Sequence, residues 1–228
     1  MLTYLFAYWW LFIPGILLSI LAQVAVSTTY SRYRKIRAAS GLTGGEAARK
    51  ILDANGLTNV RIEGVEGRLS DHYDPRTGVL RLSNETLRGH SLASLGVAAH
   101  EVGHALQHHQ KYLPLTVHIN FVPTVRITST LAPFFIIGGL IFGTVQSLLW
   151  IGIILYSFAV VYSLVSLPIE LNASKRAVHA LSTSMMLKRS ELPGVKSILT
   201  AAAFTYVAAA ITSILHLIRL VLISRARR

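Results

Sequence analysis

The chain of 228 residues has no cysteine and few charged residues. Without cysteine, neither a disulfide nor a thiolate metal ligand can form. Asp, Glu, Lys and Arg make up only 14% of the residues, against roughly 25% in a typical soluble domain. These four residue types are absent from three long blocks, residues 1–31, 127–169 and 197–218. Because a helix needs about 20 apolar residues to cross the hydrocarbon core of a bilayer, the blocks predict transmembrane helices.

The charged residues that remain are mostly basic. There are 22 Lys and Arg against 10 Asp and Glu, which gives a net charge of +12. No basic stripe interleaved with aromatic residues indicates a nucleic-acid module, so we expect no nucleic-acid partner. Basic residues also gather at the cytoplasmic ends of membrane spans, and the segment SRYRKIR at 31–37 directly follows the first block. We therefore expect a lipid bilayer as the partner of the apolar blocks.

The first block is interpreted as an uncleaved membrane anchor. It has no basic n-region, and its apolar run is too long for the h-region of a signal peptide. We expect a span at residues 4–27, with the N-terminus outside the cell.

Between the first two blocks, the sequence patterns predict a small α+β region. Thr43 and Glu46 have the spacing of a capping box at the start of a helix over 43–56. Alternating apolar and polar residues predict short strands at 60–65, 68–73 and 79–83. Ser91 is a suitable N-cap for a helix over 92–110. An apolar stripe predicts that this helix has one buried face, formed by Leu95, Ala99, Val102 and Leu106.

The predicted helix over 92–110 contains the sequence HEVGH. His100 and His104 are four residues apart, so both imidazoles lie on one helical face and can reach one Zn²⁺ at about 2.0–2.1 Å. Glu101 can then act as general base toward a water that the zinc makes acidic. Two surface histidines on a helix are the alternative. We expect one catalytic Zn²⁺ per chain, because the motif lies where an amphipathic helix is independently predicted.

The other histidines are weaker candidates for metal ligands. His108 continues the four-residue spacing, but it lies about 12 Å from His100 along the helix axis at 1.5 Å per residue. One ion therefore cannot bind both of them together with His104. We expect four histidines at surfaces or interfaces: His90, His108, His109 and His118. For His72 and His179, the sequence does not decide between a surface position and a role in the site.

A catalytic zinc site needs a third protein ligand and an open fourth position. Glu170 and Glu191 are the only acidic residues after Glu101. Glu170 follows Pro168 at the end of an uncharged block, where a new helix is expected to begin. Spacing alone leaves two interpretations open: Glu170 is the third ligand, or it is a carboxylate favoured by the dipole at a helix N-terminus.

Three segments together resemble the YugP-type membrane zinc metallopeptidases: HEVGH, PIELNASKRA at 168–177 and DHYDPR at 71–76. The resemblance covers nearly the whole chain. More distantly, the chain is similar to the HtpX-like membrane proteases, which share a gluzincin core. The resemblance implies a zincin-like catalytic domain, endopeptidase activity on proteins or peptides, and Glu170 as the third ligand. The wider group often has an Asp four residues after this Glu, bonded to a ligand histidine. Ser174 has that place here, and its hydroxyl can accept the bond but adds no charge.

The position of Glu170 also predicts the membrane topology. If Glu170 meets the two histidines, the chain between them crosses the membrane an even number of times. The 43 uncharged residues at 127–169 are enough for two spans. We expect a hairpin of spans at 127–145 and 148–167 with its turn at 143–147, and one long tilted helix is the alternative.

The expected organisation has five parts. They are an anchor at 1–30, a zincin-like region at 31–126, the hairpin at 127–168, a helical segment with the third ligand at 169–197, and a last helix with a basic tail at 198–228. Residues 32–126 carry 13 basic and 8 acidic residues, and residues 170–196 carry 5 and 2. Both regions, and the active site with them, are therefore expected in the cytoplasm of a multi-pass cell-membrane protein. A last span at about 198–222 then leaves the tail arginines outside, against the positive-inside rule, and a re-entrant helix is the alternative.

The expected fold class is a mostly α integral membrane protein with about four transmembrane helices and a small α+β gluzincin domain. The expected function is zinc-dependent hydrolysis of peptide bonds in membrane or membrane-proximal proteins. Four residues are candidates for the donor that stabilises the oxyanion: Tyr206, His179, His72 and Tyr73. The strand at 79–83 is the expected edge strand on which an extended substrate pairs.

Two other functional classes stay open at this point. One is a non-proteolytic membrane protein that binds metal or acts as a scaffold, but the presence of Glu101 argues against it. The other is a metal transporter, which is disfavoured because HEVGH lies in a charged region and not inside an apolar span. The sequence does not predict the oligomeric state or the natural substrate.

Overall fold

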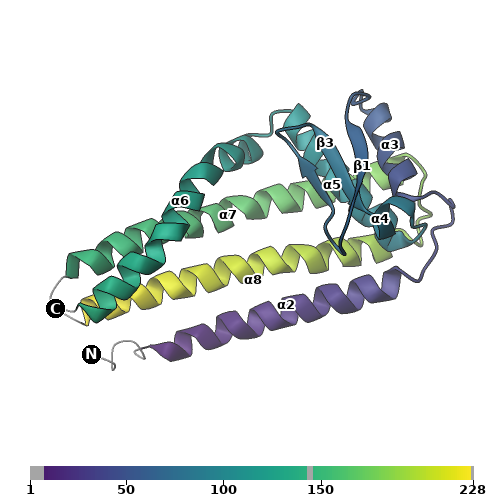
Figure 1. The fold of residues 1–228 in the computed structure, drawn as a ribbon. Helices are drawn as coiled ribbons and strands as arrows, with labels where there is room; N and C mark the ends of the chain where they lie inside the picture. The colour runs from purple at the N-terminus through teal and green to yellow at the C-terminus, as the bar shows by residue number, and fades with distance from the viewer. Residues whose placement is uncertain (1–7, 143–145, 227–228) are drawn as a thin grey trace. The chain divides into compact units, whose positions relative to one another are not determined.

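The computed structural model describes residues 8–142 and 146–226 of the chain (Figure 1). They form two compact units, each made of several stretches of the sequence. We term these the helical unit and the mixed unit. Within the described chain, the helical unit comprises residues 8–23, 117–142, 146–167 and 204–226, and the mixed unit comprises residues 24–116 and 168–203.

Four long helices account for most of the chain. A short 3-10 turn, η1 (Trp9–Leu11), precedes the first of them. The four helices are α2 (Phe12–Tyr33), α6 (Leu113–Ile141), α7 (Gln146–Thr183) and α8 (Leu192–Arg225). All four are long and apolar enough to cross a membrane, so the prediction of about four such helices is confirmed. Of the span expected at 4–27, residues 4–7 lie outside the described chain.

The uncharged block at 127–169 contributes to two helices, α6 and α7, and does not form one long helix. Glycines let the two helices approach closely. A Cβ atom on Gly139 would lie 2.5 Å from the backbone nitrogen of Leu149, and one on Gly152 would lie 2.8 Å from that of Ile136. These contacts pair the end of α6 with the start of α7, as in an antiparallel hairpin. Residues 143–145 of the expected turn lie outside the described chain.

The mixed unit contains a small sheet with helices packed beside it. Its further elements are α3 (Gly44–Ala54), β1 (Arg61–Val65), β2 (His72–Asp74), β3 (Val79–Ser83), α4 (Asn84–Arg88) and α5 (Leu92–His109). The helices predicted at 43–56 and 92–110 are present as α3 and α5, and α4 was not predicted. The capping box is also present, since Thr43 Oγ1 accepts from the Glu46 N–H at 3.1 Å and the Glu46 carboxylate accepts from the Thr43 N–H at 2.8 Å.

The three strands have the order β1-β3-β2. Strand β1 pairs parallel to β3, and β2 pairs antiparallel to β3. The central strand is therefore β3, and the expectation that residues 79–83 form an edge strand is wrong. The tight turn at 74–78 makes β2 and β3 neighbours, whereas β1 joins the far side of β3 through a longer connection that no local signal specifies. The edge strand in contact with α5 is β2, which is shorter than the strand predicted at 68–73.

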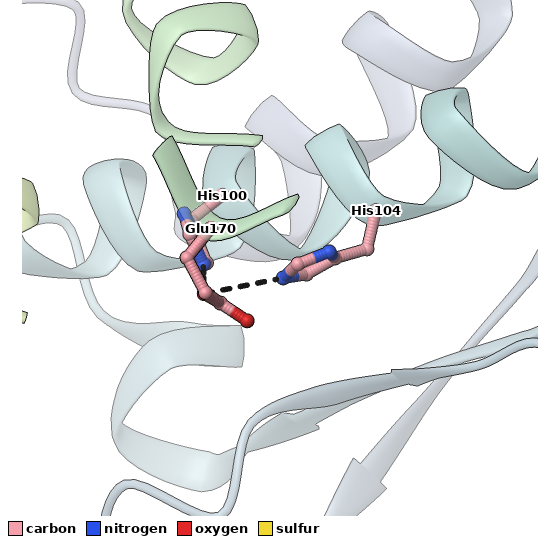
Figure 2. Close-up of side chains that lie close together, drawn as sticks. All are labelled: His100, His104 and Glu170. Atoms are coloured by element: carbon pink, nitrogen blue, oxygen red, sulfur yellow. Dashed lines mark hydrogen bonds and ion pairs between the residues drawn. The ribbon is translucent and has the colours of Figure 1, made fainter. Parts of the chain in front are cut away.

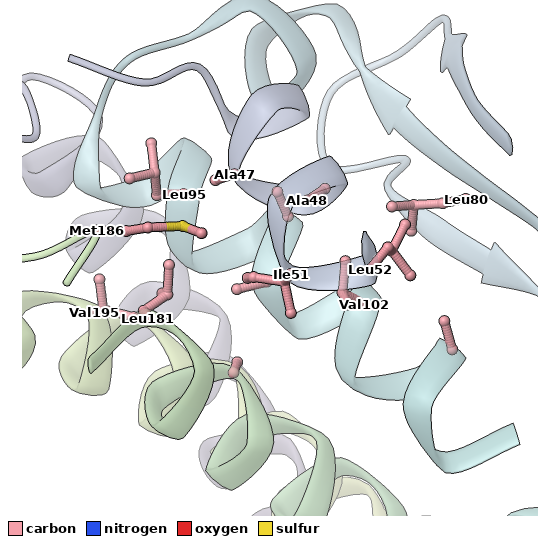
Figure 3. Close-up of a cluster of buried hydrophobic side chains, with 14 of the residues drawn as sticks. Ala47, Ala48, Ile51, Leu52, Leu80, Leu95, Val102, Leu181, Met186 and Val195 are labelled. Carbon is pink, nitrogen blue, oxygen red and sulfur yellow. The ribbon is translucent and has the colours of Figure 1, made fainter. Parts of the chain in front are cut away.

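A continuous apolar core holds the mixed unit together (Figure 3). The predicted stripe of α5 is buried in full: Leu95, Ala99, Val102 and Leu106. The same cluster includes Leu52 from α3, Leu80 from β3, Leu181 from α7 and Val195 from α8. Each fully buried leucine contributes about 1.5–3 kcal/mol relative to an exposed one. The core therefore fixes the rotation of α5 against α3 and against the parts of α7 and α8 in this unit.

Candidate metal centre

Helix α5 presents HEVGH with a defined orientation. Ser91 caps its first turn, because the Ser91 Oγ accepts from the Ser94 N–H at 3.0 Å. Val102, in the middle of the motif, is fully buried in the core. His100 and His104 consequently lie on a neighbouring face, where their side chains are 13% and 16% exposed. They are therefore accessible to a small ligand but largely shielded from bulk water.

Helix α7 supplies Glu170 from its interior. The helix continues through Pro168, so the expectation that a new helix begins after this proline is wrong. A proline removes one backbone hydrogen bond and clashes with the preceding turn, but long apolar helices tolerate such interruptions. Because Glu170 is far from the start of α7, a helix N-terminal dipole does not account for this carboxylate.

A glycine allows α5 and α7 to approach each other at the motif. A Cβ atom on Gly103 would lie 2.7 Å from the carbonyl oxygen of Ala173 and 3.1 Å from its Cα. Ala173 is itself fully buried. Glu170 lies one turn before Ala173, so this backbone contact sets the distance between the carboxylate and the two histidines.

The side chains of His100, His104 and Glu170 converge on one point (Figure 2). Oε2 of Glu170 lies 3.1 Å from Nε2 of His100 and 3.7 Å from Nε2 of His104. One possible ligand atom from each residue lies within 4.8 Å of the others. Two imidazole nitrogens and one carboxylate oxygen are the donors of a His₂Glu zinc site. The residues present therefore fit Zn²⁺.

The other ring nitrogen of each histidine has its own partner. Nδ1 of His100 lies 3.2 Å from the Ser174 hydroxyl, and Nδ1 of His104 lies 3.1 Å from Oε1 of Gln107. When Nδ1 donates to such a partner, the Nε2 lone pair is available to a metal. Nε2 of His100 bonds to Oε2 of Glu170, a carboxylate that can only accept, so a metal ion would take the place of the proton on Nε2.

Gln107 was missed in the sequence analysis. It is fully buried, and its amide nitrogen donates to the Ile169 carbonyl at 2.8 Å and to Oδ1 of Asn172 at 3.0 Å. It thus links His104 to the turn of α7 that carries Glu170. The available signal was a polar residue three positions after His104, at a place in α5 that faces the core.

Glu101 lies beside the histidines and is held by strand β2. Its Oε2 accepts from the backbone N–H of Tyr73 at 3.1 Å. Burial raises the pKa of Glu101, although the nearby histidines oppose the shift. A carboxylate with a raised pKa is a stronger base, and efficient general bases have pKa values close to the working pH.

The cluster attracts positive charge. Burial disfavours the charged form of Glu170, but His100 and His104 outweigh this effect and hold the pKa of Glu170 well below its usual range. Burial also lowers the pKa of His104, yet the carboxylates of Glu170 and Glu101 together raise it to about 9. The electrostatic field of these groups thus stabilises a cation at the point where the three side chains meet.

The remaining candidates do not join the cluster. His72 is exposed, with Nδ1 2.8 Å from the Ser70 carbonyl. The Tyr73 hydroxyl lies 2.9 Å from Nδ1 of His108, so this pair is engaged away from the converging atoms. His179 lines a separate groove on α7. Tyr206 belongs to the helical unit, and its role stays a prediction.

Comparison with known proteins gives two matches. A model of the family described as "Putative neutral zinc metallopeptidase" matches residues 8–225. The chain is also 45% identical over 206 residues to the "Putative membrane protease YugP" of Bacillus subtilis (strain 168), across 90% of this chain and 91% of that protein. No solved structure matches the chain significantly.

Proposed function

The chain belongs to the neutral zinc metallopeptidase family, and from this membership we propose that it is a membrane-embedded endopeptidase of the gluzincin type. Its substrates are proteins of the membrane or close to it. One observation carries the proposal: Nε2 of His100, Nε2 of His104 and Oε2 of Glu170 converge, with Glu101 next to them in the motif. In this proposal the first three residues hold one zinc ion, and Glu101 is the catalytic base.

Zinc at this site would polarise the scissile carbonyl and lower the pKa of a water molecule toward 7. Glu101 accepts the proton of the attacking water and delivers it to the nitrogen of the leaving amine, so that the carboxylate is regenerated. The Tyr73 N–H bond holds the Glu101 carboxylate in place for both transfers. Ser174 and Gln107 keep the two imidazoles in the tautomer and orientation that binding requires.

Strand β2 is the edge on which we place an extended substrate. It is an outer strand of the sheet, and the N–H of Tyr73 is directed to Glu101 instead of to β3. A peptide that pairs along this edge passes beside the catalytic base. The proposed edge strand for substrate pairing is therefore β2, in place of the strand at 79–83 that the sequence pattern suggested.

We further propose that the active site faces the cytoplasm. Most of the charged residues belong to the mixed unit, in the segments that precede and follow the apolar hairpin in the sequence. Residues 32–126 alone carry 13 basic residues. Clusters of Lys and Arg near spans are retained on the cytoplasmic side.

The proposed function can be tested with purified full-length protein and the Glu101→Gln variant. We expect about one zinc per chain in both, because Glu101 acts on water and is not a ligand. Cleavage of an unfolded protein substrate should fall by about 100-fold or more in the variant, since general bases contribute 10²–10⁴-fold. Undiminished cleavage by Glu101→Gln would refute the assigned base. A wild-type protein that holds zinc but cleaves neither soluble nor membrane substrates would support the scaffold alternative.

A further inference from the structure

A groove with apolar walls runs beside Ser174 in the mixed unit, between the residues of α7 and α8 in that unit. Its volume is about 520 Å³, within the range of about 300–1,000 Å³ that is typical of small-molecule sites. Four of its ten lining residues are aliphatic: Leu171, Val178, Leu199 and Ala203. A groove of this size and composition can hold a flexible hydrocarbon chain.

Two lysines give the groove a positive charge. Lys175 and Lys196 both line it, and no acidic residue does. Within the described chain, neither ammonium group lies within 4.0 Å of a carboxylate. Two ammonium groups without a carboxylate partner next to aliphatic walls are complementary to a ligand with an apolar chain and an anionic head.

The position of Ser174 shows that the groove is not the place where a peptide bond is cleaved. Ser174 contacts His100 at Nδ1, whereas the atoms that converge at the metal centre are the Nε2 atoms and Glu170 Oε2. Ser174 lines the groove, whereas the three residues that converge at the metal centre do not, so a ligand in the groove reaches His100 only through Ser174. It would touch a residue that orients a metal ligand without occupying the site of reaction.

We propose that this groove binds an anionic membrane lipid, whose phosphate contacts Lys175 and Lys196 and whose acyl chain lies along the aliphatic wall. Both helices that line the groove are long and apolar enough to be membrane spans, and its lining residues lie next to the expected span ends at residues 167 and 198, so the groove adjoins the bilayer surface. Basic pockets between such helices are known to take anionic head groups. The proposal concerns binding alone and does not depend on the protease assignment.

A site-directed quenching experiment tests the proposal. The chain has no cysteine, so a single Ser182→Cys substitution in the groove can carry a fluorescent label in the full-length protein. Detergent-solubilised protein is titrated with brominated phosphatidylglycerol or brominated phosphatidylcholine, whose bromine atoms quench a label that they contact. We expect half-maximal quenching by the anionic lipid at a concentration at least 10-fold lower than by the zwitterionic lipid.

Substitutions of the two lysines identify the source of the preference. In the Lys175→Gln/Lys196→Gln background, the anionic lipid should lose its advantage of about 10-fold or more, because basic residues near an anionic head group favour its binding. The Lys175→Arg/Lys196→Arg protein should keep it, and so should Lys50→Gln/Lys188→Gln, which alters exposed lysines outside the groove. Equal quenching by the two lipids, or a preference unchanged in the double Gln protein, overturns the proposal. Protection of the label by an acidic apolar peptide but not by phosphatidylglycerol would instead identify a peptide site.

Discussion

Gly103 on α5 and Ala173 on α7 lie so close that no side chain fits between them. The nearest atom to a Cβ at position 103 would be the Ala173 carbonyl oxygen, at 2.7 Å. This atom belongs to the backbone of a buried helix, so it cannot rotate away as a side chain could. The contact lies between two of the proposed ligands in sequence, His100 and His104, and one turn from the third, Glu170.

The first prediction follows from this contact. Gly103→Ala should push α7 away from α5, lower the zinc affinity by about 10-fold or more, and reduce the free energy of unfolding by about 1–3 kcal/mol, as overpacking usually does. Zinc competition with a chromophoric chelator and thermal unfolding measure the two effects. Gly138→Ala in α6 is the matched control, because its new Cβ would meet only Leu148 Cδ1, at 3.9 Å. Wild-type zinc affinity in the Gly103→Ala protein would show that the contact does not position the ligands.

The second prediction concerns Ser174, which contacts Nδ1 of His100. Ser174→Ala removes this partner, and partners of this kind are worth about 10–100-fold in metal affinity or activity. We expect a loss near the lower end, because a neutral hydroxyl stabilises the ligand ring less than a carboxylate does. Ser174→Asp should restore or increase the zinc affinity, since a charged acceptor strengthens the bond to the Nδ1–H. The same zinc competition assay compares the three proteins, and an affinity in Ser174→Ala equal to that of wild type contradicts the assigned role.

Local signals predicted the helix that carries the candidate site. Ser91 and the apolar stripe gave the bounds and the buried face of α5, and the spacing of His100 and His104 then required both to lie on one accessible face. The comparisons confirm the resemblance to the YugP-type peptidases. The expectation for Glu170 came from the more distant HtpX-like group, and the structure brings this carboxylate to the histidines. Spacing alone had left that residue undecided.

Tertiary features were not accessible from the sequence. The order of the three strands depends on a parallel pairing of β1 with β3 that joins segments without a shared turn. The continuity of α7 through Pro168 depends on the packing of neighbouring helices, which a local rule for proline does not include. The sequence marks Gln107 only as a polar residue at a core-facing place in α5, because its role arises when α7 brings Ile169 and Asn172 against it.

The third prediction tests the topology. Single cysteines at Asn59 and Thr183, both exposed in the mixed unit, should react with a membrane-impermeant maleimide only after the cytoplasmic face is made accessible. A cysteine at Thr144, within the expected turn of the hairpin, should react from outside in intact cells. The reason is that two spans between the histidines and Glu170 return the chain to the same side. Labelling of positions 59 and 183 from opposite sides is the result that this topology forbids.

The last prediction concerns Glu170, the proposed third zinc ligand. Glu170→Ala should lower both the zinc affinity and the proteolytic activity by 10-fold at the very least, because even the loss of a residue behind a ligand costs about 10–100-fold. Glu170→Gln should behave similarly, since a neutral amide is a poor zinc ligand. Zinc content after dialysis at buffered low free metal, measured beside cleavage, separates the loss of the metal from the loss of the base in Glu101→Gln.

Two other glutamates serve as controls for Glu170. Glu191 accepts from the backbone N–H of Ala39 at 2.7 Å and from that of Lys188 at 2.8 Å, so Glu191→Ala should lower the thermal stability and leave zinc binding unchanged. Glu66 is exposed, and Glu66→Ala should change neither property. Full zinc occupancy of Glu170→Ala under the same conditions would exclude this carboxylate as a ligand. The third donor would then have to come from another residue, and the argument that Glu170 and the histidines require an even number of membrane crossings would lose its basis.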